Sequence, residues 1–150
     1  MRVMKGDLFT NDTNTIGHGV NCAGVMGAGI AKPIREKYPN NFSNYRAACR
    51  RGLLVPGKTM VNVENDTVIF NIASQNKPGR DARYDWLFGA ALDAAEQAVA
   101  MDLDTIALPM IGCGIGGLEG YKVLRILETI EYMLNDGNRA NVFQWEVWRQ

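Results

Sequence analysis

The chain has 150 residues, of which 47% are hydrophobic, a size and composition typical of one domain that buries a sizeable core. Its 16 basic and 16 acidic residues cancel, so the overall charge gives no reason to expect attraction to nucleic acid or to a membrane surface. No apolar run approaches the roughly 18 residues of a transmembrane helix, and no signal peptide is visible, so we expect a soluble, cytoplasmic protein.

In chain order, alternating apolar runs and helical patterns predict a single α/β domain over residues 1–150. The expected elements are strands at residues 1–5 and 15–20, helices at 28–37 and 41–51, paired strands at 59–63 and 67–73, a helix at 84–101, a strand at 105–109, a helix at 118–135 with Gly137 beyond it, and a strand at 141–148. Pro39 helps to end the first helix, and the alanine-rich period of residues 84–101 is typical of a long helix.

The three cysteines, Cys22, Cys49 and Cys113, are odd in number and scattered, which suits a reducing compartment better than a disulfide framework. No CxxC pair occurs, so we expect no structural zinc site. We also expect no bound cofactor.

Two glycine-rich loops, at residues 25–30 and 112–117, each follow a predicted strand and lead into a predicted helix. Glycine lets backbone N–H groups approach a phosphate closely, and the following helix N-terminus adds a partial positive charge. Two such loops fit one pyrophosphate, although each could instead serve only as a tight turn.

Familiar phosphate-binding motifs are excluded by single residues. Ile30 and Ala31 stand where a P-loop needs Lys and Ser or Thr, and Lys32 stands where a dinucleotide fingerprint needs its third glycine. Neither Cys22 nor Cys113 is followed by the arginine of a cysteine phosphatase.

The segment from His18 to Ala31, with Gly6-Asp7-Leu8 before it and the segment from Pro109 to Leu118 after it, resembles the macrodomain family over the whole chain. The resemblance implies a three-layer α/β/α sandwich with a mixed central sheet and an ADP-ribose cleft. It points to the branch containing ADP-ribose-1''-phosphate phosphatases, terminal ADP-ribose–protein glycohydrolases, and antitoxins that strip ADP-ribose from thymidine in DNA. Residues 25–51 are especially similar to the antitoxins.

The resemblance assigns a ligand contact to each of three polar or aromatic residues. It implies that Asp7 accepts a hydrogen bond from the adenine amino group, that Asn21 holds the distal ribose, and that Trp148 stacks on the adenine. As alternatives, Asp7 ends a turn, Asn21 caps a turn and Trp148 belongs to the core. The other implied ligand contacts are Leu8, Val25, Met26, Gly27, Ala28, Gly29, Ile30, Ser74, Gln75, Gly112, Cys113, Gly114, Ile115, Gly116 and Gly117.

His18 is the only histidine, and similar phosphatases carry a histidine at this place. We therefore expect His18, together with Asn21, to be catalytic, with the imidazole assisting the attacking water or protonating the leaving ribose oxygen. Residues 18 and 21 point to opposite faces of a regular strand, so His18 meets the ligand only if the chain bends near Gly19. The alternative is a histidine satisfied within the sheet.

The family's glycohydrolases and DNA-directed antitoxins use a lysine just after the fourth strand, where this chain has Ser74 or Gln75, and Lys77 comes two positions later than Gln75. The glycohydrolase branch also has an aspartate where this chain has Gly116. These departures favour a metal-independent, monomeric ADP-ribose-1''-phosphate phosphatase that binds ADP-ribose or its 1''-phosphate and has no stable affinity for nucleic acid. Two alternatives stay open: a glycohydrolase of modified protein or nucleic acid that uses Lys77 or a bound water, and a non-catalytic ADP-ribose reader.

Overall fold

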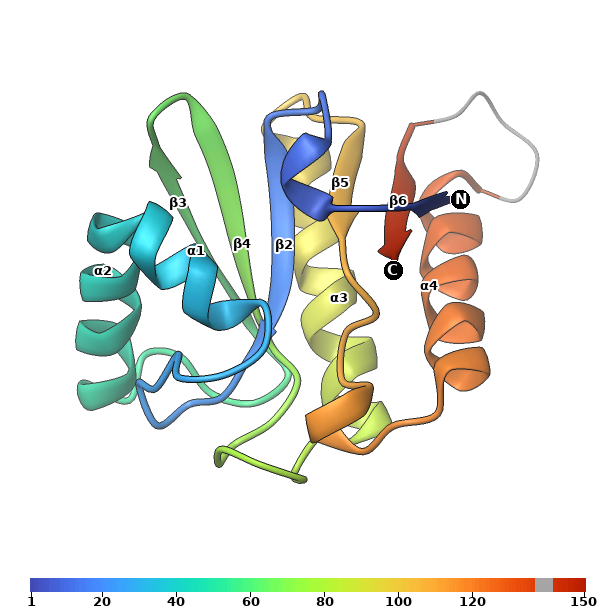
Figure 1. The fold of residues 1–150 in the computed structure, drawn as a ribbon. Coiled ribbons are helices and arrows are strands. Elements are labelled where there is room, and N and C mark those ends of the chain that lie inside the picture. Colours follow the sequence, from blue (N-terminus) through green and yellow to red (C-terminus); the bar gives the residue numbers. More distant parts are fainter. Residues whose placement is uncertain (137–141) are drawn as a thin grey trace.

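The computed structural model describes residues 1–136 and 142–150 and contains a six-stranded sheet in the order β1-β6-β5-β2-β4-β3 (Figure 1). Only β3 runs antiparallel to its neighbour; the other pairs are parallel. The mixed sheet is therefore confirmed. Its strands are β1 (Arg2–Lys5), β2 (Thr15–Val20), β3 (Thr59–Glu64), β4 (Thr67–Ala73), β5 (Thr105–Leu108) and β6 (Gln144–Arg149).

Helices cover both faces of the sheet, which confirms the three-layer α/β/α sandwich. Helices α1 and α2 pack together against β2 and β3, whereas α3 and α4 pack together against β3, β4, β5 and β6. The helices are α1 (Ala31–Lys37), α2 (Pro39–Arg50), α3 (Tyr84–Ala100) and α4 (Gly120–Leu134), and two short 3₁₀ turns are η1 (Leu8–Thr10) and η2 (Gly114–Gly116). Within the described ranges, no helix combines the length and the hydropathy needed to cross a membrane.

The face of α3 that meets the sheet is made almost entirely of alanine. Ala91, Ala94 and Ala98 are fully buried, together with Leu87 near the start of the helix. Small side chains let the helix lie close to the sheet, and the larger side chains of the strands, such as Phe70, fill the space between them.

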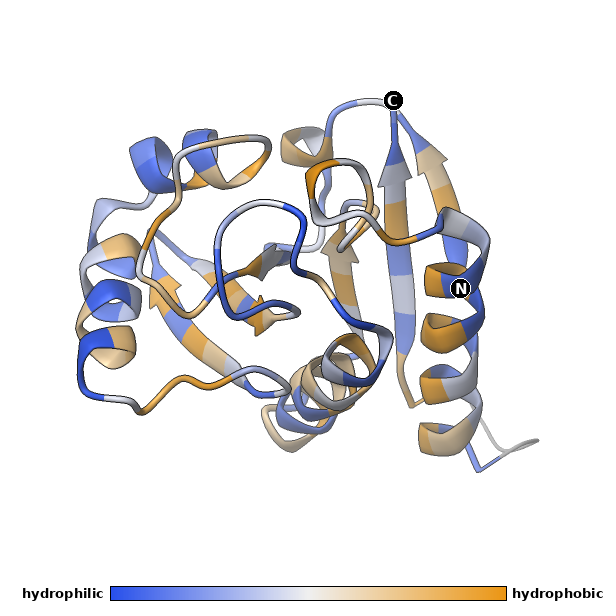
Figure 2. Ribbon diagram, turned by 90° about the horizontal axis from the view of Figure 1, so that it is seen from below, coloured by the Kyte–Doolittle hydropathy of each residue, from blue (hydrophilic) through white to orange (hydrophobic). Residues whose placement is uncertain are grey.

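The three adjacent strands β5, β2 and β4 are parallel, so their carboxyl ends meet at one edge of the sheet. The connections from β2 to α1, from β4 to α3 and from β5 to α4 all leave this edge. Seen from that end, the three connections lie beside one another (Figure 2). Backbone hydrogen bonds join them: Cys22 N–H donates to Asn76 O at 3.0 Å, and Ala82 N–H donates to Gly116 O at 3.3 Å.

The sequence predicted β2 and β4 with the observed bounds, but two helices begin later than expected. Helix α1 begins at Ala31 rather than residue 28, because Gly29 has a φ of +59°, which a right-handed helix does not contain. Helix α4 begins at Gly120 because η2 occupies the chain before it. The last strand begins at Gln144, whereas residue 141, its expected start, and Gly137 lie outside the described residues.

A buried network of carboxamides joins α2 to the sheet. Asn71 Nδ2 donates to Asn41 Oδ1 at 2.8 Å, and Asn41 Nδ2 donates to Asn71 Oδ1 at 3.2 Å. The backbone N–H of Asn41 also donates to a carboxylate oxygen of Glu64 at 2.7 Å. Because Asn41 and Asn71 are both fully buried, their polar atoms have no access to water, and each depends on the other for hydrogen bonds.

We therefore expect Asn41→Ala to lower the free energy of unfolding by about 1–3 kcal/mol, because it removes the hydrogen bonds that join Asn41 to Asn71 and to Asn62. Urea denaturation measures this change. Asn40→Ala is the matched control, because the side chain of Asn40 is exposed on the same helix, and it should change the free energy of unfolding by less than about 0.5 kcal/mol. Equal effects of the two substitutions would show that the network does not anchor α2.

Candidate functional site

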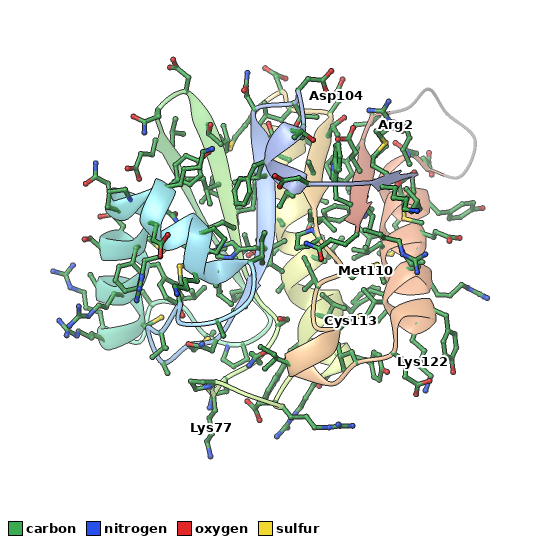
Figure 3. The ribbon with its side chains drawn as sticks, viewed as in Figure 1. Arg2, Lys77, Asp104, Met110, Cys113 and Lys122 are labelled. Atoms are coloured by element: carbon green, nitrogen blue, oxygen red, sulfur yellow. The ribbon has the colours of Figure 1, made fainter. Side chains whose placement is uncertain are left out.

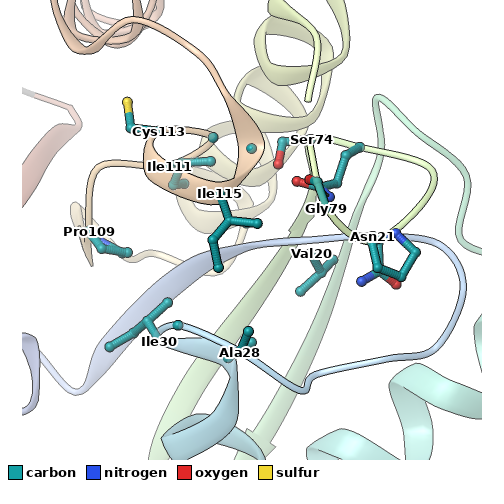
Figure 4. Close-up of a pocket in the computed structure, with 18 of the residues that line it drawn as sticks. Val20, Asn21, Ala28, Ile30, Ser74, Gly79, Pro109, Ile111, Cys113 and Ile115 are labelled. Atoms are coloured by element: carbon teal, nitrogen blue, oxygen red, sulfur yellow. Dashed lines mark hydrogen bonds between the residues drawn. The ribbon is translucent and has the colours of Figure 1, made fainter. Parts of the chain in front are cut away.

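A cleft of about 470 Å³ opens at the carboxyl ends of β2, β4 and β5 (Figure 4). Three segments form its walls: the first loop (residues 21–31), the middle segment (residues 74–79) and the second loop (residues 109–116). The cleft therefore lies at the edge of the sheet where the sequence placed the two glycine-rich loops.

The residues that line the cleft carry no Asp, Glu, Lys, Arg or His side chain in the part of the chain that the structure describes. An anion held there would interact mainly with backbone N–H dipoles and with neutral polar side chains. Cys113 is the one lining side chain with a resolved pKa shift, and burial raises the pKa of its thiol, so it stays neutral. In the same described residues, no group of three or more His, Cys, Asp or Glu side chains could hold a metal ion.

The carboxamide of Asn21 shapes the first loop. Its Oδ1 accepts hydrogen bonds from Ala23 N–H at 3.0 Å and from the Tyr45 hydroxyl at 2.8 Å, and its Nδ2 donates to Val25 O at 2.8 Å. Burial raises the pKa of Tyr45, so its hydroxyl keeps the proton that it donates. Asn21 thus lines the cleft while it also holds the backbone of the loop in place.

Gly29 and Gly114 line the cleft, one from each loop, and share an unusual backbone conformation. Their φ angles are +59° and +66°, a left-handed conformation that residues with a side chain rarely adopt. A Cβ added at either residue would meet no heavy atom within 4 Å. Glycine is therefore required here by the backbone conformation, and the space beside it is open.

In the middle segment, Ser74 and Gln75 both line the cleft but differ in their hydrogen bonding. The Ser74 hydroxyl is 1% exposed and has no hydrogen-bond partner among the described residues. Gln75 Nε2 donates to Lys77 O at 2.6 Å and to Gly79 O at 3.0 Å, which curls the segment back on itself. Ser74 is consequently the buried side chain of the cleft whose polar atom remains unpaired.

The structure does not bring Lys77 into the cleft. Its side chain is exposed and extends away from the body of the molecule (Figure 3). Asp81 fixes this arrangement, because its carboxylate accepts hydrogen bonds from the backbone N–H groups of Asn76 and Lys77 at 2.9 and 2.8 Å. Lys77 therefore does not lie where it could substitute for the family's lysine, which was one of the alternatives left open by the sequence.

The structure also corrects the expected position of His18. No bend occurs near Gly19: β2 stays in register with β4, with His18 opposite Asn71 and Val20 opposite Ala73. The imidazole is fully buried, and its Nε2 lies 2.8 Å from Asn71 Oδ1. Burial lowers the pKa of His18 from 6.5 to about 4, although the hydrogen bond with Asn71 acts in the opposite direction. His18 is therefore a neutral member of the carboxamide network and does not line the cleft.

The residues expected to bind adenine lie at the β1–β6 edge of the sheet, apart from the cleft lining. The carboxylate of Asp7 accepts a hydrogen bond from Phe9 N–H at 2.9 Å and caps η1, a turn that the sequence analysis missed. Trp148 is half-buried, and its Nε1 donates to Glu146 at 2.8 Å. Leu8 packs in the interior. Of these three predicted residues, Asp7 and Trp148 keep an accessible side chain and Leu8 does not.

Most of the remaining expected contacts do line the cleft. The two exceptions are Met26 and Gly117, which do not line the cleft. Met26 is 1% exposed and packs against α2. Lining residues that the sequence analysis missed are Gly19, Val20, Ala31, Pro78, Gly79, Pro109, Met110 and Ile111. The Pro78-Gly79 pair is a turn signal placed just after a predicted strand, and it could have identified the third wall.

Comparison with known proteins gives a consistent result. The Macro domain family model matches residues 18–127. The chain is 28% identical over 150 residues to the DNA ADP-ribosyl glycohydrolase of Mycobacterium tuberculosis, covering 91% of this chain and 43% of that relative. It is 43% identical over 54 residues to the ADP-ribose 1''-phosphate phosphatase of Neosartorya fischeri, covering 35% of this chain and 27% of the relative. The solved macrodomain of Mycobacterium tuberculosis DarG superposes with a TM-score of 0.85 at 26% identity, covering 99% of this chain and 97% of that one.

The buried imidazole makes stability depend on pH in a defined direction. In the unfolded chain His18 binds a proton near pH 6.5, whereas in the folded chain it does so only near pH 4. Protons therefore favour the unfolded state as the pH falls from 6.5 to 4, and the contribution of His18 to the free energy of unfolding falls by about 3 kcal/mol.

His18→Gln, which cannot take up a proton in this range, isolates that contribution from the carboxylates. The difference in the free energy of unfolding between wild type and variant, measured by urea denaturation, should shift by about 3 kcal/mol between pH 7 and pH 4, with the wild type losing more. A difference that stays constant with pH would mean that water reaches His18.

Proposed function

The chain belongs to the macro domain family, and from that premise we propose that its cleft binds ADP-ribose and that the protein releases ADP-ribose from modified nucleic acid. The observation that carries the proposal is the pair of strand–glycine–helix loops whose residues line one neutral cleft. A diphosphate suits such a site because several backbone N–H groups can approach it from two sides.

The elements around the cleft suggest how ADP-ribose would lie. The diphosphate would sit between residues 25–30 and residues 112–116, and the distal ribose would face Asn21, Ser74 and Gln75. The Ser74 hydroxyl, buried and without a partner in the described chain, is suited to a ribose hydroxyl, since such a bond would satisfy both groups. The adenine would extend toward Asp7 and Trp148 at the β1–β6 edge.

Two observations favour glycohydrolysis over removal of the 1''-phosphate. The first is the extent of the similarity, which covers 91% of this chain for the DNA ADP-ribosyl glycohydrolase and 35% for the phosphatase. The second is the position of His18, whose burial leaves the cleft without the general acid or base on which the phosphatase mechanism depended. The chain spans less than half of the glycohydrolase relative, so its activity as a separate protein is part of the proposal.

Cleavage of a glycosidic bond needs less from ionisable side chains, because its transition state resembles a positively charged oxocarbenium ion. The negative charge of the bound diphosphate would stabilise that cation. Water would then add its hydroxyl to C1'' of the ribose, and the departing base would take up the remaining proton. Asn21 and Ser74, at the expected position of the distal ribose, would hold the sugar in place for this attack.

A panel of three substrates tests the reaction: a single-stranded oligonucleotide carrying ADP-ribose on a base, an ADP-ribosylated peptide, and free ADP-ribose 1''-phosphate. We expect the purified protein to release ADP-ribose from the oligonucleotide and no phosphate from ADP-ribose 1''-phosphate, as measured by chromatography of the products. Phosphate release would restore the phosphatase assignment. Binding of ADP-ribose without turnover of any substrate would identify a reader.

The glycines of the two loops test the binding mode. Gly29→Val and Gly114→Val should each lower the affinity for ADP-ribose by at least about 100-fold in calorimetry, because a side chain there displaces a diphosphate held by two or more charge-assisted hydrogen bonds of about 1.5–3 kcal/mol each.

Gly52→Val is the matched control, since Gly52 has a φ of +69° and no neighbour within 4 Å of an added Cβ but lies outside the cleft lining. All three variants carry the same backbone strain, of about 1–3 kcal/mol. Only the two loop variants should lose affinity for ADP-ribose. Equal loss of affinity in all three variants would show that backbone strain, and not displacement of the diphosphate, causes the effect.

A further inference from the structure

The zero net charge of the chain hides an uneven distribution of charge along the molecule. Five exposed aspartates lie in connections that lead into parallel strands, at the edge of the sheet opposite the cleft: Asp12, Asp66, Asp102, Asp104 and Asp136. Figure 3 shows Asp104 at this end and Lys77 at the other. The net charge of the chain is therefore zero, although acidic and basic residues are unevenly placed at the two ends of the molecule.

At the cleft end, one exposed cation lies beside each wall, and we call Arg46, Lys77 and Arg80 the cationic rim. Arg46 packs against the first loop, where a Cβ at Gly24 would lie 3.4 Å from its Cγ. Arg80 packs against the connection after the second loop, where a Cβ at Gly117 would lie 2.7 Å from its Cγ. Lys77 lies between them in the middle segment.

Further exposed arginines extend the cationic rim on both sides. Arg50 and Arg51 lie at the carboxyl end of α2, and Arg83 precedes α3. The guanidinium of Arg83 lies 4.1 Å from the centre of the Trp86 ring, so a planar cation is held beside a half-buried aromatic side chain. In Figure 2 the segment between β4 and α3, which carries Lys77, Arg80 and Arg83, is coloured mainly hydrophilic.

The acidic groups at the same end balance only part of this charge. The hydrogen bond from Lys77 N–H is the main cause of the lowered pKa of Asp81, and the charges of Arg83 and Lys77 lower it further, so Asp81 offsets part of the positive charge of this segment. Glu119 pairs with Lys122 at 3.1 Å, and Asp85 lies in the first turn of α3. In the described ranges, none of the ion pairs involves the three residues of the cationic rim.

We propose, on the basis of the function proposed above, that the cationic rim binds the phosphate backbone of a single-stranded nucleic acid on both sides of the ADP-ribosylated nucleotide. Three cations around an uncharged cleft place positive charge where a polyanion would pass, while the ADP-ribose itself enters a site without ionised side chains. A base linked to buried ADP-ribose must leave any duplex stack, which favours an unpaired strand. The expectation of no affinity for nucleic acid considered only the summed charge.

The probe is a fluorescein-labelled single-stranded DNA of about 12 nucleotides without ADP-ribose, with an RNA of the same sequence and the matching DNA duplex as comparisons. Fluorescence anisotropy between about 50 and 200 mM salt gives the slope of log affinity against log salt concentration. For the triple variant Arg46→Gln, Lys77→Gln, Arg80→Gln, the slope should decrease in magnitude by about 2, since each lost single-strand phosphate contact removes about 0.7. Its affinity for free ADP-ribose, measured by calorimetry, should stay within about threefold of wild type, because no altered side chain lines the cleft.

The matched control is the triple variant Arg35→Gln, Lys37→Gln, Arg125→Gln, which removes the same charge from residues outside the cationic rim and should keep the wild-type slope. The proposal is overturned if the wild type does not bind the single strand, if both triple variants lose affinity equally, or if the duplex binds more tightly than the single strand. An absence of ADP-ribose binding by the wild type would instead contradict the proposed function, whatever the oligonucleotide shows.

Discussion

The cleft depends on the carboxyl ends of β5, β2 and β4 meeting at one edge of the sheet. Parallel pairing places the three following connections side by side, and each must then turn away toward a helix. The hydrogen bonds of Asn21 hold the first of these turns, and the glycines at 29 and 114 let the backbone adopt left-handed conformations beside open space. The cleft that follows from this arrangement is lined without ionised Asp, Glu, Lys, Arg or His side chains among the described residues.

The polar residues in β2 and β4 and just after them have two different roles. The role of each residue depends on the face of the sheet on which it lies and on its distance from the edge of the sheet. His18 and Asn71 lie within the sheet and point toward α2, where they hold that helix through Asn41. Ser74 comes just after β4, and its unpaired hydroxyl lines the cleft. Polar groups that hold the fold and polar groups that line the cleft are thus separated by only a few residues along the chain.

Strong local patterns made much of the fold predictable. The β-branched and aromatic run from Thr67 to Ala73 gave the observed bounds of β4, and the glycines located both loops of the cleft. The sequence left two roles open for His18, because it does not show whether β2 bends near Gly19; the regular register with β4 decides for the role within the sheet. The cationic rim was equally hidden, since Arg46 and Arg80 come together only through the fold.

The central claim is that backbone amides of the two glycine loops bind ADP-ribose. Amide chemical shifts measured by NMR during an ADP-ribose titration test it most directly, because they report each N–H group separately. The account predicts that the largest shifts occur at residues 25–30 and 112–116, and that the side-chain signals of His18 and Asn71 change little. The absence of shifts in both loops, or shifts confined to residues outside the cleft, would contradict it.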